Sequence, residues 1–104
     1  DLNFENGDNV SHMLVSGFSG KLGDDLDTDD DGVLDILPWS TIIDSISLVE
    51  SLTSGDKYYS DIVLGPDDSY VPAHVIRCDW GWIMGEFEFG LDDSPGVSNV
   101  CPVP

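Results

Sequence analysis

The residues best suited to chemistry in this chain are the aspartates of one acidic stretch, residues 24–35, in which seven of twelve residues are aspartate. The stretch contains the spacing Asp27-x-Asp29-x-Asp31-Gly32-x-x-Asp35. Carboxylates at alternate positions of a tight loop direct oxygen atoms toward a common centre, and Ca²⁺ takes roughly six to eight such ligands. The spacing therefore predicts a calcium-binding loop.

The position of each residue in this loop predicts its role. Asp27, Asp29, Asp31 and Asp35 are expected to ligate by side chain, and the turn at the glycine brings the carbonyl of Val33 inward. A full EF-hand loop has a glutamate at its twelfth position, but that position is proline here and no amphipathic helix flanks the loop. A further ligand must come from elsewhere. The candidates are Asp24, Asp25, Asp44 and Glu50, and Asp25 completes the predicted ligand set.

The alternative interpretation is an acidic, solvated loop without an ion. Two carboxylates about 4 Å apart repel by roughly 1 kcal/mol even in bulk water, and by more near a protein surface. A folded loop that holds several such pairs needs a counter-charge, which favours bound Ca²⁺. Two further acidic turns, Asp67-Asp68 and Asp92-Asp93, are expected to be solvated, although either could lend a ligand to a second calcium.

Composition limits the classes of protein to which the chain can belong. Its 104 residues are 40% hydrophobic and 10% aromatic, which is typical of one small globular domain. The formal net charge of −18 would repel nucleic acid and anionic lipid. The sequence has no run of about twenty apolar residues, so no membrane insertion is expected.

Cys78 and Cys101 are predicted to form a disulfide, which would stabilise the fold by roughly 3 kcal/mol in the chain-entropy model. The alternative is two free buried thiols. An even cysteine count, scarce lysine and a calcium loop agree with an extracellular or cell-surface protein. A chain that begins Asp1-Leu2-Asn3, without methionine, is expected to be a processed product or part of a longer one. The triplet Asn9-Val10-Ser11 matches a glycosylation sequon.

Five segments are predicted to be strands: 12–18, 41–50, 58–64, 70–78 and 80–87. Segment 41–50 has apolar residues at helical spacing, but its β-branched residues favour a strand. Pro72 indicates an edge or bulge in its segment, and Gly85 a bulge in the last one. Short strands separated by turn residues predict an all-β protein, an antiparallel sandwich or barrel.

No catalytic motif is present, so the chain is not expected to be an enzyme. His12 and His74 lie on different predicted strands without a nucleophile motif beside them, and a carboxylate pair for glycoside hydrolysis is disfavoured in so small a chain. Trp80 and Trp82 would share one face of a strand. With Phe87 they would form a platform for a glycan or partner, although core packing is favoured.

Several motifs along the chain resemble the lamin-tail-like domains of secreted bacterial proteins. They are Leu14-Val15-x-Gly17-Phe18-x-Gly20, Gly23-x-Asp25-Leu26-Asp27-x-x-Asp30-Asp31-Gly32, Pro38-Trp39, Asp44-Ser45, Leu48-Val49-Glu50 and Asp93-Ser94-Pro95-Gly96-Val97-x-Asn99. The closing motif is the most characteristic of the family.

The resemblance implies an immunoglobulin-like antiparallel sandwich with an inserted Asp-rich calcium loop, and a role in assembly, filaments or adhesion. The alternative is a carbohydrate-binding module or an accessory domain of a secreted hydrolase. Nothing before His12 resembles the strands that usually open the family's domains. Residues 1–104 are therefore expected to be one sandwich domain or the C-terminal part of one. The implied partner is protein, through self-assembly or the missing strands of a longer chain.

Overall fold

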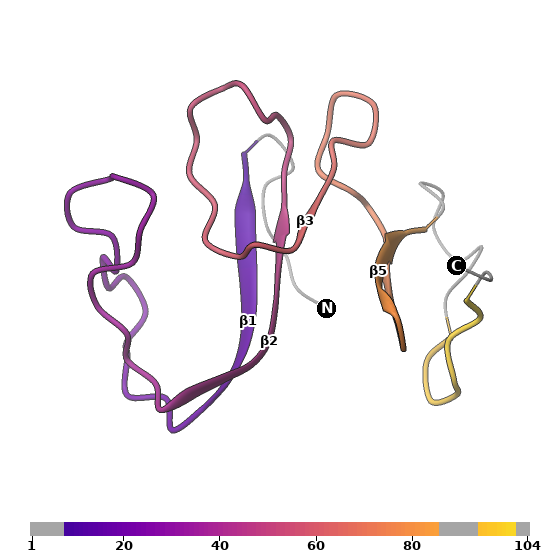
Figure 1. Cartoon of the computed structure of the whole chain (residues 1–104), viewed down its shortest axis with the longest axis horizontal. Coiled ribbons are helices and arrows are strands. Elements are labelled where there is room, and N and C mark those ends of the chain that lie inside the picture. Colours follow the sequence, from indigo (N-terminus) through magenta and orange to yellow (C-terminus); the bar gives the residue numbers. More distant parts are fainter. Residues whose placement is uncertain (1–7, 86–93, 102–104) are drawn as a thin grey trace.

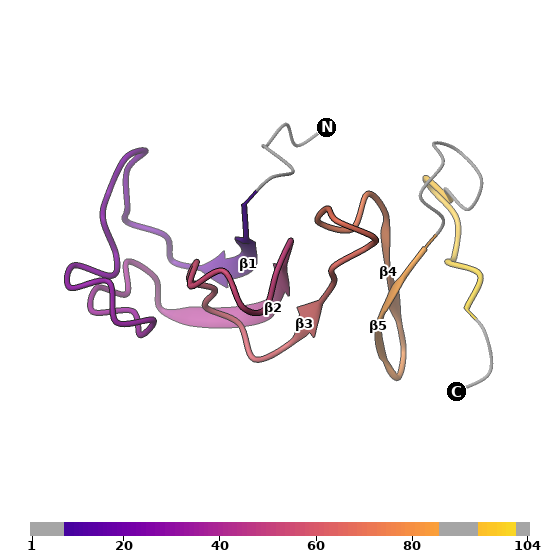
Figure 2. The ribbon, with the colours of Figure 1, turned by 90° about the horizontal axis from the view of Figure 1, so that it is seen from above.

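The structure is a computed structural model that describes residues 8–85 and 94–101. In these residues the chain forms five β-strands in two small sheets and no helix. The strands are β1 (Val10–Ser16), β2 (Thr41–Leu48), β3 (Val63–Leu64), β4 (Val75–Cys78) and β5 (Gly81–Met84). The Asp-rich segment lies on one side of the first sheet and the β4–β5 hairpin on the other (Figures 1 and 2). The all-β prediction is confirmed for the described residues.

The first sheet has the order β1-β2-β3, with β1 antiparallel and β3 parallel to β2. Segment 41–50 is a strand, as its β-branched residues predict, and not a helix. Pairing shifts between Leu14 and Val15, where Ile43 has no partner, so the first sheet has its bulge here. β1 starts two residues earlier than predicted and ends before Gly17, whose φ of 67° is unfavourable for other residues.

Alternation along β2 places apolar and polar side chains on opposite faces of the first sheet. Ile46 and Leu48 form the buried core cluster with Val71, and Val10, Leu64, Val75 and Trp82 pack against it. Ser45 and Ser47 lie on the other face, and Ser47 is fully buried. The core therefore sits between the first sheet and the hairpin, while a polar face turns toward residues 58–62.

That polar face explains why most of the predicted strand 58–64 is not a strand. The hydroxyl of Ser47 accepts the amide of Ser60 at 2.9 Å, and the hydroxyl of Ser11 accepts the amide of Tyr59 at 2.8 Å. The two hydroxyls are 2.8 Å apart. Because serine side chains take these amides, residues 58–62 form no ladder with the sheet, and ladder pairing begins only at β3. The prediction of a strand over 58–62 is wrong for this reason.

The side chain of Asn9 forms hydrogen bonds with the loop that follows β2. Its side-chain oxygen accepts the amide of Glu50 at 2.9 Å, and its nitrogen donates to the carbonyls of Ser51 and Asp56 at 3.2 and 3.1 Å. In the folded chain the nitrogen that a glycan would occupy at the sequon is thus already engaged by two backbone acceptors.

The second sheet is the β4–β5 hairpin, which is shorter than its predicted strands. Asp67 and Tyr70 exchange backbone hydrogen bonds in a turn, and Pro72 has no amide to donate to a ladder. The predicted strand 70–78 therefore begins only at Val75. Trp80 lies in the turn between the strands, while Trp82 lies in β5 and packs on the core. The prediction that these tryptophans share a strand face is therefore wrong. Phe87 lies outside the described residues.

Asp44 and Arg77 form a partly exposed ion pair. Arg77 Nε donates to Asp44 Oδ2 at 3.1 Å, and its guanidinium lies 5.9 Å from the ring centroid of Trp82. The Arg77 hydrogen bond holds the pKa of Asp44 below its ordinary value of 3.8, and partial desolvation opposes this effect. A carboxyl with a lowered folded-state pKa contributes stability above its unfolded pKa, and loses it as the pH falls through the folded value.

We therefore expect Asp44→Asn to lower the melting temperature by a few degrees at pH 6, since the pair is partly exposed. The difference from wild type should shrink as the pH falls below about 4 and then vanish. Thermal melts in chelator, which separate this effect from any metal effect, test it. A difference that stays constant down to pH 2 would show that the charge of Asp44 contributes nothing.

A disulfide joins Cys78 of β4 to Cys101, 23 residues later. Cys78 is 3% exposed and belongs to the buried core. Asn99 strengthens the same attachment, since its nitrogen donates to the carbonyl of Arg77 at 2.7 Å. Residues 94–101 are thus held against the hairpin. No helix in the described ranges is long and apolar enough to cross a membrane.

Candidate metal centre

The Asp-rich segment is a loop with a closed neck. The amides of Asp35 and Ile36 both donate to the carbonyl of Leu26, at 2.7 and 3.1 Å. Between these points the backbone takes positive φ values at Asp30 (54°) and Gly32 (89°). Aspartate and glycine are among the residues that tolerate this conformation best, so the sequence suits the two sharp bends.

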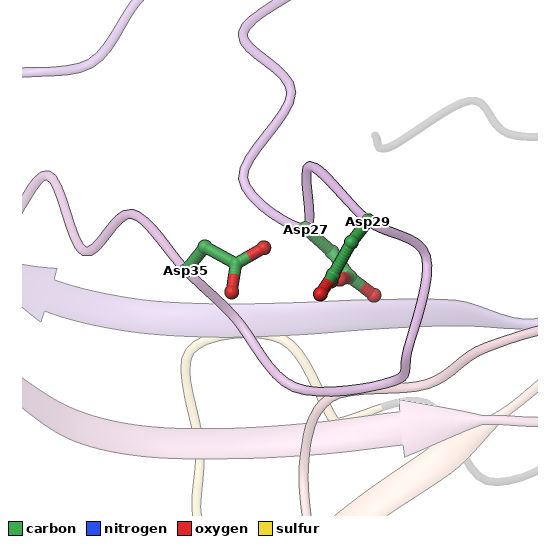
Figure 3. A group of neighbouring side chains, drawn as sticks. All are labelled: Asp27, Asp29 and Asp35. Carbon is green, nitrogen blue, oxygen red and sulfur yellow. The ribbon is translucent and has the colours of Figure 1, made fainter.

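Asp27, Asp29 and Asp35 bring their carboxylates together within this loop. One oxygen from each lies within 4.8 Å of the others, and Figure 3 shows the three groups turned toward a common region. The three carboxylates could hold a metal ion. Asp27 is buried at 3% exposure, while Asp29 and Asp35 are exposed, so the cluster has a buried floor and an open side.

Asp27 organises the loop. Its Oδ2 accepts the amide of Gly32 at 2.9 Å and the Tyr59 hydroxyl at 2.8 Å, and its Oδ1 accepts the amide of Asp31 at 3.2 Å. Burial acts to raise the pKa of Asp27, but these hydrogen bonds outweigh it and hold the pKa below its ordinary value. The fixed donors thus favour a carboxylate at the floor of the cluster.

Asp29 is in the opposite electrostatic situation. Partial desolvation and the negative charges of Asp31 and Asp35 raise its pKa. The negative charge of Asp35 is stabilised by two hydrogen bonds, because the amide and the hydroxyl of Thr28 both donate to its Oδ2, at 2.8 and 2.9 Å. A cation placed among the three carboxylates would relieve the repulsion felt at Asp29.

The other residues of the predicted ligand set are not in this three-carboxylate cluster. Asp31 accepts the amide of Val33 at 2.9 Å, so its carboxylate caps its own turn. Val33 is 65% exposed. Asp25 lines a neighbouring hollow, and Asp44, a further candidate, forms a partly exposed ion pair with Arg77. The structure thus brings together loop positions one, three and nine.

Tyr59 is the residue near the cluster that sequence reasoning missed. It lies 32 residues from Asp27, in a segment predicted only to be a strand. Burial, followed by its hydrogen bond to Asp27, raises the pKa of Tyr59 to about 12. The phenol therefore stays a donor at physiological pH and links the loop to the serine face of the first sheet. No spacing along the chain signals this contact.

We expect Tyr59→Phe to lower the melting temperature by roughly 5 °C, because it removes a donor from a buried carboxylate. Tyr58→Phe is the matched control, since it deletes the same atom from the adjacent tyrosine, which is 36% exposed. Thermal melts followed by circular dichroism test both. Equal melting temperatures for the two variants would contradict a role for the Tyr59 hydroxyl.

A groove runs beside the loop. It has a volume of about 600 Å³ and is lined by residues of the Asp-rich loop and of segment 52–63. Aromatic and acidic side chains both contribute, among them Tyr58, Tyr59, Asp31, Asp56 and Asp61. Rings and carboxylates in an open groove are groups that can contact sugars, which gives the glycan alternative a physical location.

Comparison of the chain with protein families, with curated proteins and with solved structures finds no match.

Proposed function

We propose that this chain is an extracellular structural module that acts through protein contacts and is stabilised by Ca²⁺ in the Asp-rich loop. The observation that carries the proposal is the convergence of Asp27, Asp29 and Asp35, with one oxygen of each within 4.8 Å of the others. Oxygens at that spacing suit ligand distances of about 2.3–2.6 Å around one calcium ion. Water would complete the shell, since Asp31 and Val33 lie outside the three-carboxylate cluster.

The proposed architecture is an immunoglobulin-like sandwich of the lamin-tail-like kind. Two small sheets that enclose one core in the described residues, together with the motifs that resemble this family, support it. The disulfide between Cys78 and Cys101 supports an extracellular location, because disulfides persist in oxidising compartments. The proposal gives the chain no catalytic role.

Isothermal titration with CaCl₂ tests the metal at the centre of this proposal. The chain is expected to bind Ca²⁺ more tightly than Mg²⁺, because flexible all-oxygen sites discriminate against the smaller ion. Asp29→Asn should reduce the affinity at least tenfold, since it removes a charged ligand. Heats identical to buffer dilution would refute the site.

Glycan binding is the second candidate function. The groove beside the loop is a better location for a glycan than the two tryptophans, because Trp80 lies in a turn and Trp82 packs against the core. Tyr58 is the exposed ring of this groove. Binding on a glycan array that Tyr58→Ala abolishes and Trp80→Ala leaves intact would support this candidate. An array without signal would exclude it for the glycans displayed.

A further inference from the structure

The groove beside the Asp-rich loop lies outside the three-carboxylate cluster. Its volume of about 600 Å³ falls within the range of roughly 300–1,000 Å³ that is common for ligand sites. One wall contains Asp31 and Gly32 of the Asp-rich loop, and the other comes from segment 52–63. The groove is therefore large enough to receive side chains of a bound molecule between two separate segments.

This groove is negatively charged. Asp31, Asp56 and Asp61 line it, and Lys57 is the basic residue among its described lining residues, so its formal charge is −2. The groove belongs to a chain whose total charge is −18, and a field of one sign attracts partners of the opposite sign. Nucleic acid, anionic lipid and a second copy of this chain are all repelled. The charge therefore favours a cationic occupant.

Apolar surface in the same groove suits the stems of lysine and arginine. Leu52 is 59% exposed and the ring of Tyr58 is 36% exposed, and both line the groove. Long basic side chains lay their methylene stems along apolar surface. Their charged heads are also attracted to the face of an aromatic ring. The groove thus offers contacts both to the stem and to the head of a basic side chain.

The chain's own Lys57 shows that a basic side chain fits against this wall. Its Cδ lies 3.6 Å from the position that a Cβ atom on Gly32 would take, which is within contact distance. The stem of Lys57 therefore runs beside the Asp-rich loop, where the glycine leaves room for it. A lysine from another chain would meet the same kind of surface.

We propose that this groove binds a lysine- and arginine-rich segment of another protein. The aspartates of the groove contact its charged heads, and Leu52 and Tyr58 contact its stems. A neutral glycan would gain from the ring of Tyr58 but not from the carboxylates, so the charge of the groove favours the basic segment. The inference rests on the proposed function in that the module acts through protein contacts, and it does not require a bound metal.

Fluorescence anisotropy tests the proposal with a labelled peptide of alternating lysine and serine, titrated with the 104-residue chain in EGTA. Saturable binding is expected. It should weaken as salt rises, because charges are screened beyond about 8 Å at 0.15 M. The same peptide with glutamate in place of each lysine should not bind. Absence of binding by the lysine peptide at physiological salt would overturn the proposal.

Lys57→Gln is the most specific variant, because it should tighten peptide binding about threefold by removing the ammonium that repels the peptide. A gain in affinity cannot come from a damaged fold. Lys21→Gln is the matched control, since it makes the same charge change at an exposed lysine outside the groove. Equal tightening by the two variants would show that only the general field of the chain attracts the peptide, and would overturn the proposal.

Asp61→Asn should weaken binding about threefold. Asp56 is less suitable, because its Oδ2 accepts the hydroxyl of Ser54 at 3.1 Å. Asp79→Asn is the matched control, because Asp79 lies in the turn of the β4–β5 hairpin, on the other side of the first sheet from the Asp-rich loop (Figures 1 and 2). Equal weakening by both variants would overturn the proposal.

Two replacements of Tyr58 test the contact with the ring. Tyr58→Leu should weaken peptide binding about threefold, whereas Tyr58→Phe, which keeps the ring, should preserve it. Equal affinities for the two variants would overturn the role of the ring. Peptide binding in EGTA by a chain that shows no heat with CaCl₂ would refute the metal proposal alone. Calcium binding without peptide binding, or glycan binding in its place, would refute the present inference alone.

Discussion

Removal of calcium by a chelator is expected to lower the melting temperature by about 10–20 °C when the starting concentration is near 100 times Kd. The expected effect is large because the proposed ion would bind the folded chain and not the unfolded one. Without the ion, three carboxylates that converge on one region repel one another. Differential scanning calorimetry in CaCl₂ and in EGTA, at equal ionic strength, measures the difference directly.

Asp29→Asn is the most informative variant for this shift. Asp27 and Asp35 also hold the loop together through backbone amides, so their replacement would damage the fold as well as the site. Asp29→Asn should remove most of the calcium effect and leave the melting temperature in EGTA equal or higher, because its charge is repelled by Asp31 and Asp35.

Asp68→Asn is the control for this variant. It makes the same charge change in a different acidic turn, at a positive φ of 59° that asparagine also tolerates. It should retain the full calcium shift. An unchanged shift in Asp29→Asn, or a shift equally reduced in both variants, would mean that general charge screening is responsible.

Loss of the disulfide is expected to produce an effect of similar size. Cys78→Ala combined with Cys101→Ala should lower the free energy of unfolding by about 3 kcal/mol, from the entropy of a loop with 23 residues of separation. That corresponds to a fall in melting temperature of roughly 12–24 °C. The buried position of Cys78 in the core adds to the cost, since alanine leaves a small cavity.

Urea unfolding of the double variant and of wild type, each with and without a reducing agent, checks this expectation. Reduction should destabilise wild type by about the same amount and leave the double variant unchanged. A reduced wild-type chain as stable as the oxidised one would show that residues 94–101 contribute little to the fold.

Local sequence patterns predicted the parts of the fold that local chemistry decides. β-branched residues made segment 41–50 a strand, and the alternate aspartates with a following glycine formed a loop that brings Asp27 and Asp29 together. The strand prediction for residues 58–62 was wrong because serine hydroxyls on β1 and β2 accept hydrogen bonds from amides of this segment. Contacts between residues so far apart in the sequence leave no local pattern.

The same limit applies to the candidate metal centre. Its first and third loop positions follow from alternation, and Asp35 joins them because the amides of residues 35 and 36 close the neck on Leu26. Asp31 is not in the cluster, and its Oδ1 accepts the amide of Val33. Tyr59 supports the floor from another part of the chain, which is a tertiary contact that spacing cannot reveal.

One calcium ion is expected among Asp27, Asp29 and Asp35. A crystal grown in CaCl₂ and measured at a long wavelength would test it most directly, through the anomalous signal of the metal. A single strong peak is expected at about 2.3–2.6 Å from an oxygen of each carboxylate. Well-ordered carboxylates with no anomalous peak between them, in saturating calcium, would contradict it.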